Sequence, residues 1–186
     1  MKLKLRDILL MLLKASGERI SGKTKIQKEC YLLSQKLHKN FQFRAHYYGP
    51  YSPVVNDSLS ELVGIGFVEE KKLPWGVDNK GFEAVRYDYE LTKEGKEMAN
   101  LLKRADRQTY RQIKNLVKTL EQLNDPDYMQ LSAASKAYFI LRNEGKKMTS
   151  EEIKQKAKDF NWNLKGSDIH KAVEILEQLA MIRDQC

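Results

Sequence analysis

The chain has 186 residues, of which 41% are hydrophobic and 31% are charged. This length suffices for one large domain or two small ones, and we favour two. The apolar content is too high for a disordered chain, and no stretch approaches the ~20 apolar residues of a membrane span. The net charge of +8 is uneven. Residues 1–50 carry eleven Lys and Arg against three Asp and Glu, residues 51–100 carry six against ten, and residues 101–186 carry sixteen against twelve.

The N-terminus resembles a secretion signal only superficially. Its uninterrupted apolar run, Ile8 to Leu13, is too short, and no small-residue cleavage site follows it. We therefore expect a cytoplasmic protein. Cys30 lies on a helical stripe with Ile26 and Leu33, which predicts a buried thiol. Cys186 ends the chain, where it could form an intermolecular disulfide in air.

The first hundred residues predict a winged helix, with three helices followed by a two-stranded hairpin. The helices are expected over about 5–14, 23–37 and 53–63, with an aromatic, extended segment over 41–48. Ser52 and Pro53 are typical of a helix start, and Gly64 of a helix end. The first strand of the wing begins at Phe67, and residues 74–81 form its tip. The second strand places Val85, Tyr87, Tyr89 and Leu91 on one face and Arg86, Asp88 and Glu90 on the other.

The second half is predicted to be helical. Residues 93–124 contain no proline, so one helix of about 46 Å could span them, with a break near Asp106. The seam Ile113, Leu116, Leu120 and Leu123 suits packing within the chain or a homodimer through this helix. Three helices follow, over about 132–143, 150–160 and 167–181. The predicted fold class is mainly α with a small β-hairpin (α+β). The predicted domains are a winged helix over 1–98, a linking helix over 99–124 and a helical unit over 125–186.

The sequence offers no recognisable catalytic constellation. Its three histidines, His38, His46 and His170, are far apart, and none has a His or Cys four residues away. A zinc site needs closely spaced Cys or His, so neither a metal nor another cofactor is expected. Gly64-Ile-Gly66 precedes a strand, which is the wrong context for a phosphate-binding loop. We therefore expect a protein that is not an enzyme.

Nucleic-acid binding is the leading functional hypothesis, because the N-terminal helices concentrate positive charge. The third helix presents Asp57 and Glu61 outward, which disfavours the usual insertion into the major groove. The predicted class is still a helix-turn-helix transcription regulator, but we expect duplex DNA to contact the second helix and the wing instead. The candidate contacts are Lys23, Lys25, Lys28, Lys36, Lys39, Arg44, Lys71, Lys72, Lys80 and Arg86.

The alternative hypothesis is a protein-interaction module of antitoxin or adaptor type. Tyrosine commonly anchors protein interfaces, and the turn Tyr48-Gly-Pro-Tyr-Ser52 adjoins the acidic third helix. The candidate contacts are Tyr47, Tyr48, Tyr51, Asp57 and Glu61. The same turn also has a purely structural explanation, because Gly49 permits unusual backbone angles and Ser52 caps the next helix.

Residues 5–98 resemble the YwgA-like family of uncharacterised proteins with winged-helix character. The resemblance rests on Lys25-Ile-Gln-Lys28 with Tyr31, on Tyr48-Gly-Pro-Tyr-Ser52, on Leu62 with Gly66-Phe67, and on Tyr89-Glu-Leu-Thr-Lys-Glu-Gly95. It implies a fold but no activity. A weaker similarity to the Panacea antitoxin-type domain covers the Gln-Lys helix and the Tyr-Gly-Pro turn, and implies binding to proteins such as toxins. The C-terminal unit lies outside both patterns.

Overall fold

The computed structural model describes residues 3–77 and 83–182. It is mainly helical with a small antiparallel sheet, which confirms the predicted α+β class. In chain order the elements are α1 (Leu5–Ala15), β1 (Arg19–Ser21), α2 (Lys23–Lys36), α3 (Pro53–Gly64), β2 (Val68–Val77), β3 (Glu83–Leu91), α4 (Lys93–Ala105), α5 (Arg107–Gln122), α6 (Tyr128–Glu144), α7 (Ser150–Lys158) and α8 (Gly166–Gln178).

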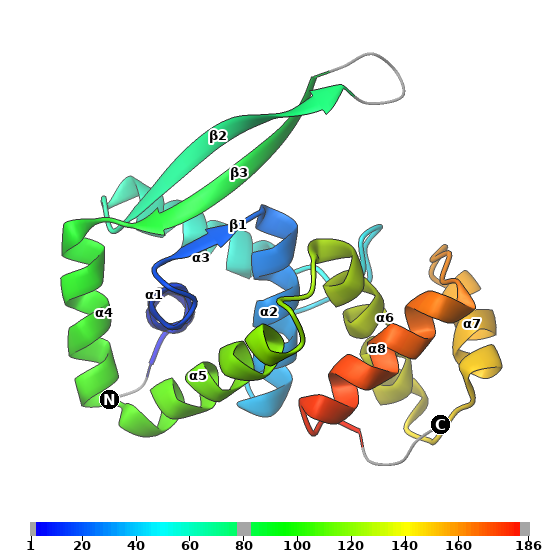
Figure 1. Cartoon of the computed structure of the whole chain (residues 1–186). Coiled ribbons are helices and arrows are strands. Elements are labelled where there is room, and N and C mark those ends of the chain that lie inside the picture. The colour runs from blue at the N-terminus through cyan, green and yellow to red at the C-terminus, as the bar shows by residue number, and fades with distance from the viewer. Residues whose placement is uncertain (1–2, 78–82, 183–186) are drawn as a thin grey trace.

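The first half has the predicted order of three helices and a hairpin, with one strand that the sequence analysis missed. The strand β1 pairs antiparallel with β3, so the sheet has the order β1-β3-β2. Ser52 caps α3 as predicted, because its hydroxyl accepts a hydrogen bond from the Val55 amide. The hairpin of β2 and β3 projects beyond the helices in Figure 1. Part of the predicted wing tip, residues 78–82, lies outside the described residues.

The predicted alternation along β3 holds at only one end. Tyr89 and Leu91 are buried as expected, but Val85 is exposed where the hairpin leaves the helices. Asp88, expected on the solvent face, is only 1% exposed because β1 covers it. Burial would raise the pKa of Asp88, but hydrogen bonds from Arg19, Arg86 and Ser21 outweigh burial and lower it. The missing strand therefore explains the wrong prediction for Asp88.

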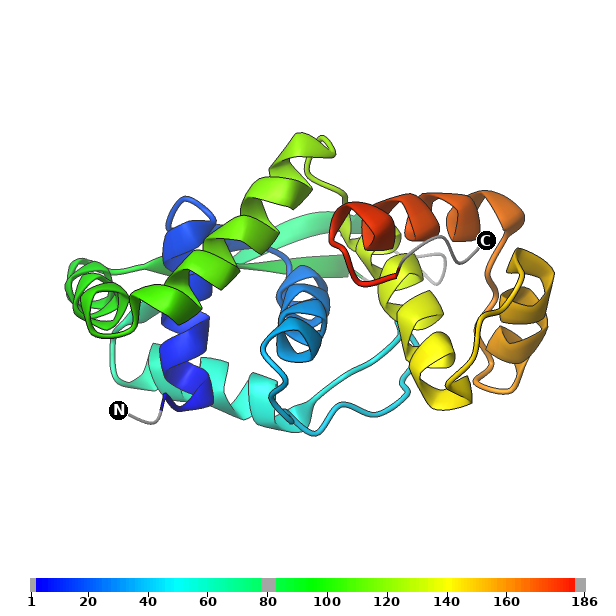
Figure 2. The ribbon, with the colours of Figure 1, turned by 90° about the horizontal axis from the view of Figure 1, so that it is seen from below.

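The predicted long helix breaks at Asp106 into α4 and α5. Asp106 caps α5 by accepting from the Thr109 amide at 2.9 Å. The chain turns sharply there, and α5 crosses α1 on the lower side of the molecule (Figure 2). The seam side chains Ile113, Leu116 and Leu120 are buried within the chain. The seam therefore packs within the chain, and the homodimer stays a prediction.

The C-terminal unit contains the three predicted helices, with α6 starting earlier than expected. Asp127 caps α6 and forms a capping box with Gln130, a signal that precedes the predicted start at Ser132. The capping box at Thr149 starts α7 as predicted. The helix α6 packs against α2, and a single cluster of buried side chains runs from α1 to α8. The proposed boundary near residue 125 therefore crosses a continuous hydrophobic core.

Cys30 is fully buried, as its stripe predicts, and burial raises the pKa of its thiol. Cys186 lies outside the described residues. Across residues 3–77 and 83–182, none of the helices combines the length and apolarity that crossing a membrane requires.

Candidate nucleic-acid interface

The turn at residues 48–52 is held by polar side chains from α2. The Gln27 amide donates to the Ser52 carbonyl and accepts from the Ser52 amide, both at 3.0 Å. The Lys28 ammonium donates to the Pro50 carbonyl at 2.8 Å. These contacts are buried, where an unpaired backbone group would be costly. The motifs around Gln27-Lys28 and the Tyr-Gly-Pro turn therefore form one structural unit.

This arrangement corrects the prediction for three lysines of α2. Lys28 is only 2% exposed, and burial lowers its pKa to about 7, with a smaller contribution from Lys136. Lys25 pairs with Asp125 at 2.7 Å, and Lys36 donates to the Leu179 carbonyl of the C-terminal unit. All three bind groups within the chain, because α2 lies between α5 and α6 instead of at the surface.

The wing is also less basic than predicted. Lys71 contacts Glu90 at 2.7 Å and Glu69 at 3.5 Å, and Arg86 contacts Asp88 at 2.8 Å. Within the sequence 68–91, four basic residues face six acidic ones, so the hairpin as a whole repels a polyanion. Lys80 lies outside the described residues. The wing is therefore a poor phosphate-binding surface.

The remaining predicted cations keep their charged groups unpaired but are scattered. Among the described residues, none of them has a carboxylate within ion-pair distance; they are Lys23, Lys39, Arg44 and Lys72. Lys23 starts α2, Lys39 follows it, Arg44 lies before the turn, and Lys72 lies on β2. These positions do not form one surface by themselves.

A denser basic surface, which the sequence analysis missed, lies at the junction of α4 and α5. We call it the basic elbow; it consists of Lys103, Arg104, Arg107, Arg111, Lys114 and Lys118. All six side chains belong to exposed residues. In the described part of the chain, none of the six has a carboxylate partner within ion-pair distance. Like charges gathered without counter-charges are typical of a surface that binds a polyanion.

The basic elbow is concave as well as positively charged. Most of its members line a surface hollow of about 420 Å³ together with Tyr110 and Asn115. The Lys103 ammonium lies 5.0 Å from the centre of the Tyr110 ring, a distance that suits a cation–π contact. Lys114 donates to the Ala15 carbonyl at 2.9 Å, which ties α5 to the end of α1. Two cations are therefore pre-positioned by contacts that leave their charge unneutralised.

The sequence does contain the signal for this surface. Along α5, basic residues recur at intervals of four, three and four, at positions 107, 111, 114 and 118. This spacing places them on one helical face, opposite the buried Ile113, Leu116 and Leu120. The seam on the opposite face predicts only how this helix packs, and the prediction of binding residues did not include the charged face.

The residues of the alternative protein-binding hypothesis are only partly accessible. Tyr47 is 72% exposed and meets Tyr48 edge to face at 4.9 Å between ring centres. Tyr51 is half-buried, and its backbone pairs with Arg44. Asp57 is exposed, whereas Glu61 forms an ion pair with Arg6 of α1. Tyr48 lines a hollow beside Met129 of α6, whereas Asp57 and Glu61 lie on α3.

Glu29 is an unexpected buried carboxyl group in α2. It is only 3% exposed, and its Oε2 has no hydrogen-bond partner among the described residues. Burial raises its pKa to about 7; Lys25 opposes this shift and Asp125 adds to it. Glu29 lines a small cavity of about 240 Å³ between α2 and α5. Residues 26–34 of α2 are all buried, so Glu29 is buried because neighbouring elements surround the helix, which the apolar stripe alone does not predict.

The described residues contain no group of three His, Cys, Asp or Glu side chains placed to hold a metal ion.

Comparison with known proteins supports part of the resemblance drawn from the motifs. No family model matches the chain. The chain is 29% identical over 171 residues to the uncharacterized protein YwgA of Bacillus subtilis (strain 168), and this match covers 90% of the chain and 91% of that protein. The chain is thus similar to YwgA. The match is too long to stop at residue 98, so it also covers most of the C-terminal unit, which corrects the narrower range inferred from the motifs.

Proposed function

We propose that the protein is a non-enzymatic regulator of winged-helix type that binds duplex nucleic acid through the basic elbow. The observation that supports this proposal is the group of six exposed, unpaired cations on α4 and α5. Nucleic-acid affinity arises largely from the release of counterions when cations contact phosphates. A hollow lined by five cations suits a phosphate backbone better than a protein surface of mixed charge.

The proposal replaces the surface inferred from the sequence while keeping the class of ligand. Lys25, Lys28 and Lys36 bind groups within the chain, so they contribute at most a general positive field. Lys23, Lys39, Arg44 and Lys72 remain available as supplementary contacts. Because all these cations would contact phosphate groups, binding is expected to depend on salt concentration more than on base sequence.

Charge reversal on α5 tests this proposal. The triple variant Arg107→Glu, Arg111→Glu, Lys118→Glu should bind a random labelled duplex more than about tenfold more weakly at physiological salt, since each cation lost removes a phosphate contact. The slope of log affinity against log salt should become shallower by about 3. Fluorescence anisotropy over a salt series measures both quantities.

The control makes the same change of charge on the far unit, in the triple variant Lys146→Glu, Lys154→Glu, Lys158→Glu. It should leave the salt slope unchanged, because these lysines lie on α7 and the loop before it. Equal losses in both triple variants would mean that net charge alone governs binding, and the basic elbow would then have no special role.

A second candidate function is binding to a partner protein through Tyr47 and Tyr48. The supporting observation is the exposure of two adjacent aromatic side chains beside Met129 of α6, which is 55% exposed. Aromatic side chains and methionine are enriched at protein interfaces.

Removing these rings is expected to release a partner without unfolding the chain. The double variant Tyr47→Ser, Tyr48→Ser should lose proteins that co-purify with the wild type, while its melting temperature stays within a few degrees, because surface substitutions cost little. The variant Asp57→Lys, Glu61→Lys tests the α3 surface separately. If every co-purifying protein remained bound to both variants, neither surface would be the interface.

A further inference from the structure

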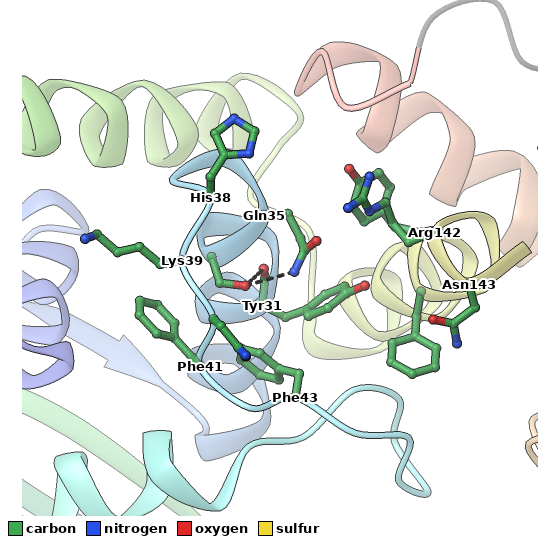
Figure 3. Close-up of a pocket in the computed structure, with 12 residues that line it drawn as sticks. Tyr31, Gln35, His38, Lys39, Phe41, Phe43, Arg142 and Asn143 are labelled. Carbon is green, nitrogen blue, oxygen red and sulfur yellow. Dashed lines mark hydrogen bonds between the residues drawn. The ribbon is translucent and has the colours of Figure 1, made fainter. Parts of the chain in front are cut away.

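A cavity lies where the two halves of the chain meet, between α2 and α6. Its volume is about 520 Å³, within the 300–1,000 Å³ typical of small-molecule sites. It is bounded by α2, by the segment at residues 38–43 and by α6. Figure 3 shows Tyr31 and Gln35 on α2 and Arg142 and Asn143 on α6, on opposite sides of this pocket. The pocket shares no residue with the basic elbow.

One wall of the pocket is aromatic. Tyr31 meets Phe43 edge to face at 5.1 Å and lies within 6.4 Å of Tyr138 and Phe139, measured between ring centres. Phe139 is held in turn by Trp162, with ring centres 5.8 Å apart. Phe43, Tyr138 and Phe139 are only partly buried, so they retain accessible surface. Such a preformed wall can take a planar ring at little ordering cost.

The rest of the pocket is positively charged. Among the described residues, its two cations are Lys39 and Arg142, and no carboxylate lines it. Within residues 3–77 and 83–182, neither Lys39 nor Arg142 has a carboxylate within ion-pair distance. The pKa of Asp106 is lowered chiefly by the Thr109 amide and to a smaller extent by the charge of Lys39. Lys39 therefore interacts with one carboxylate, but from beyond ion-pair distance. A guanidinium beside an aromatic wall suits a phosphate group.

Three amide side chains complete the lining. Gln35 donates to the Ser34 hydroxyl at 3.2 Å, and the Asn40 carbonyl accepts from the Gln42 amide at 2.9 Å. The second amide hydrogen of Gln35, both amide hydrogens of Asn40 and the exposed Asn143 side chain remain able to bond a ligand. Such groups can pair with the heteroatoms of a nucleobase.

We propose that this pocket binds a nucleotide, with its base against the aromatic wall and its phosphate at Arg142 and Lys39. A neutral aromatic ligand would leave the cations unused, and inorganic phosphate would leave the aromatic wall unused. The same chemistry is presented by a free nucleotide and by an unpaired nucleotide of a bound nucleic acid. Base stacking on aromatic side chains beside a basic groove is how proteins bind single strands.

Isothermal titration calorimetry of the full chain with AMP, GMP, CMP and UMP tests the proposal. At least one nucleotide should bind, with the corresponding nucleoside and inorganic phosphate each at least about tenfold weaker. The variant Arg142→Ala should weaken nucleotide binding by about tenfold or more. Arg142 is exposed, so this variant should fold normally. The control Lys158→Ala removes one exposed cation from α7 and should change nothing.

A second arm uses a short single-stranded oligonucleotide and the variant Tyr138→Leu, which removes a ring but keeps apolar bulk. If mononucleotides do not bind but the oligonucleotide binds and loses affinity in both pocket variants, the ligand is an unpaired nucleotide of a nucleic acid. If mononucleotides bind, and both pocket variants bind the oligonucleotide with the affinity of the wild type, the ligand is free nucleotide. If no nucleotide form binds, or if both pocket variants bind like the wild type, the proposal is overturned. The basic-elbow triple variant should still bind mononucleotides, so the two proposals can fail independently.

Discussion

Gly95→Ala is expected to destabilise the protein by about 3 kcal/mol or more, among the largest effects of a single methyl group. A Cβ atom at Gly95 would lie 1.9 Å from the carbonyl oxygen of Phe67. That carbonyl cannot move away cheaply, because it accepts a hydrogen bond from the Thr92 amide at 3.1 Å. The Thr92 hydroxyl also binds the Gly66 carbonyl at 2.8 Å and caps α4 by accepting from Gly95. The start of α4 thus rests directly on the end of α3.

Thermal or urea unfolding measures this loss, which should lower the melting temperature by about 6–12 °C for a chain of this size. Gly64→Ala is the matched control. Gly64 also lies in a helix, and a Cβ atom there would meet nothing within 4 Å. The control should be neutral or stabilising by up to about 1 kcal/mol, since alanine favours helices. A loss below about 1 kcal/mol in Gly95→Ala would mean that α4 can shift away from Phe67.

Local signals in the sequence were sufficient for most of the fold. Ser52-Pro53 and Thr149 predict helix starts through short-range chemistry, and both act as predicted. The helix α3 ends at Gly64 as expected, but the glycine in the left-handed conformation beyond it is Gly66, with φ at 78°. The strand β1 could not be predicted in this way. It has only three residues, and it exists because β3, some seventy positions later in the chain, supplies its hydrogen bonds. Without β1 there was no reason to expect Asp88 to be buried.

The binding surfaces were harder to predict than the fold, because exposure depends on distant packing. Lys28 lies off the apolar stripe of α2, which predicts an exposed side chain, yet the turn at residues 48–52 and α6 cover it. The charge of the basic elbow was visible in the sequence, but its lack of counter-charges required the structure. The nucleotide pocket joins α2 to α6 across about a hundred residues, and no local pattern encodes that contact.

Glu29→Gln is expected to remove a pH dependence of stability between about pH 4.5 and 7. The ordinary pKa of a glutamate is 4.5, and burial raises the pKa of Glu29 to about 7. Below pH 4.5 both the folded and the unfolded chain hold the proton, so its contribution to stability is complete. Between the two pKa values only the folded chain keeps it, and the free energy of unfolding falls by up to 1.36 kcal/mol per pH unit, about 3 kcal/mol in all. Above about pH 7 the contribution is lost.

Glutamine mimics the protonated carboxyl group, so the variant should gain on the wild type as the pH rises through this window. Urea unfolding at pH 5, 6, 7 and 8 measures the difference, in which the histidines and the buried Lys28 cancel because both proteins contain them. Glu177→Gln, an exposed carboxyl group on α8, should show a constant difference. If Glu29→Gln also differed from the wild type by a constant amount, the carboxylate would be ionised throughout. Its charge would then be balanced within the fold by Lys25, at the expense of the Lys25–Asp125 ion pair that now joins α2 to the segment between α5 and α6.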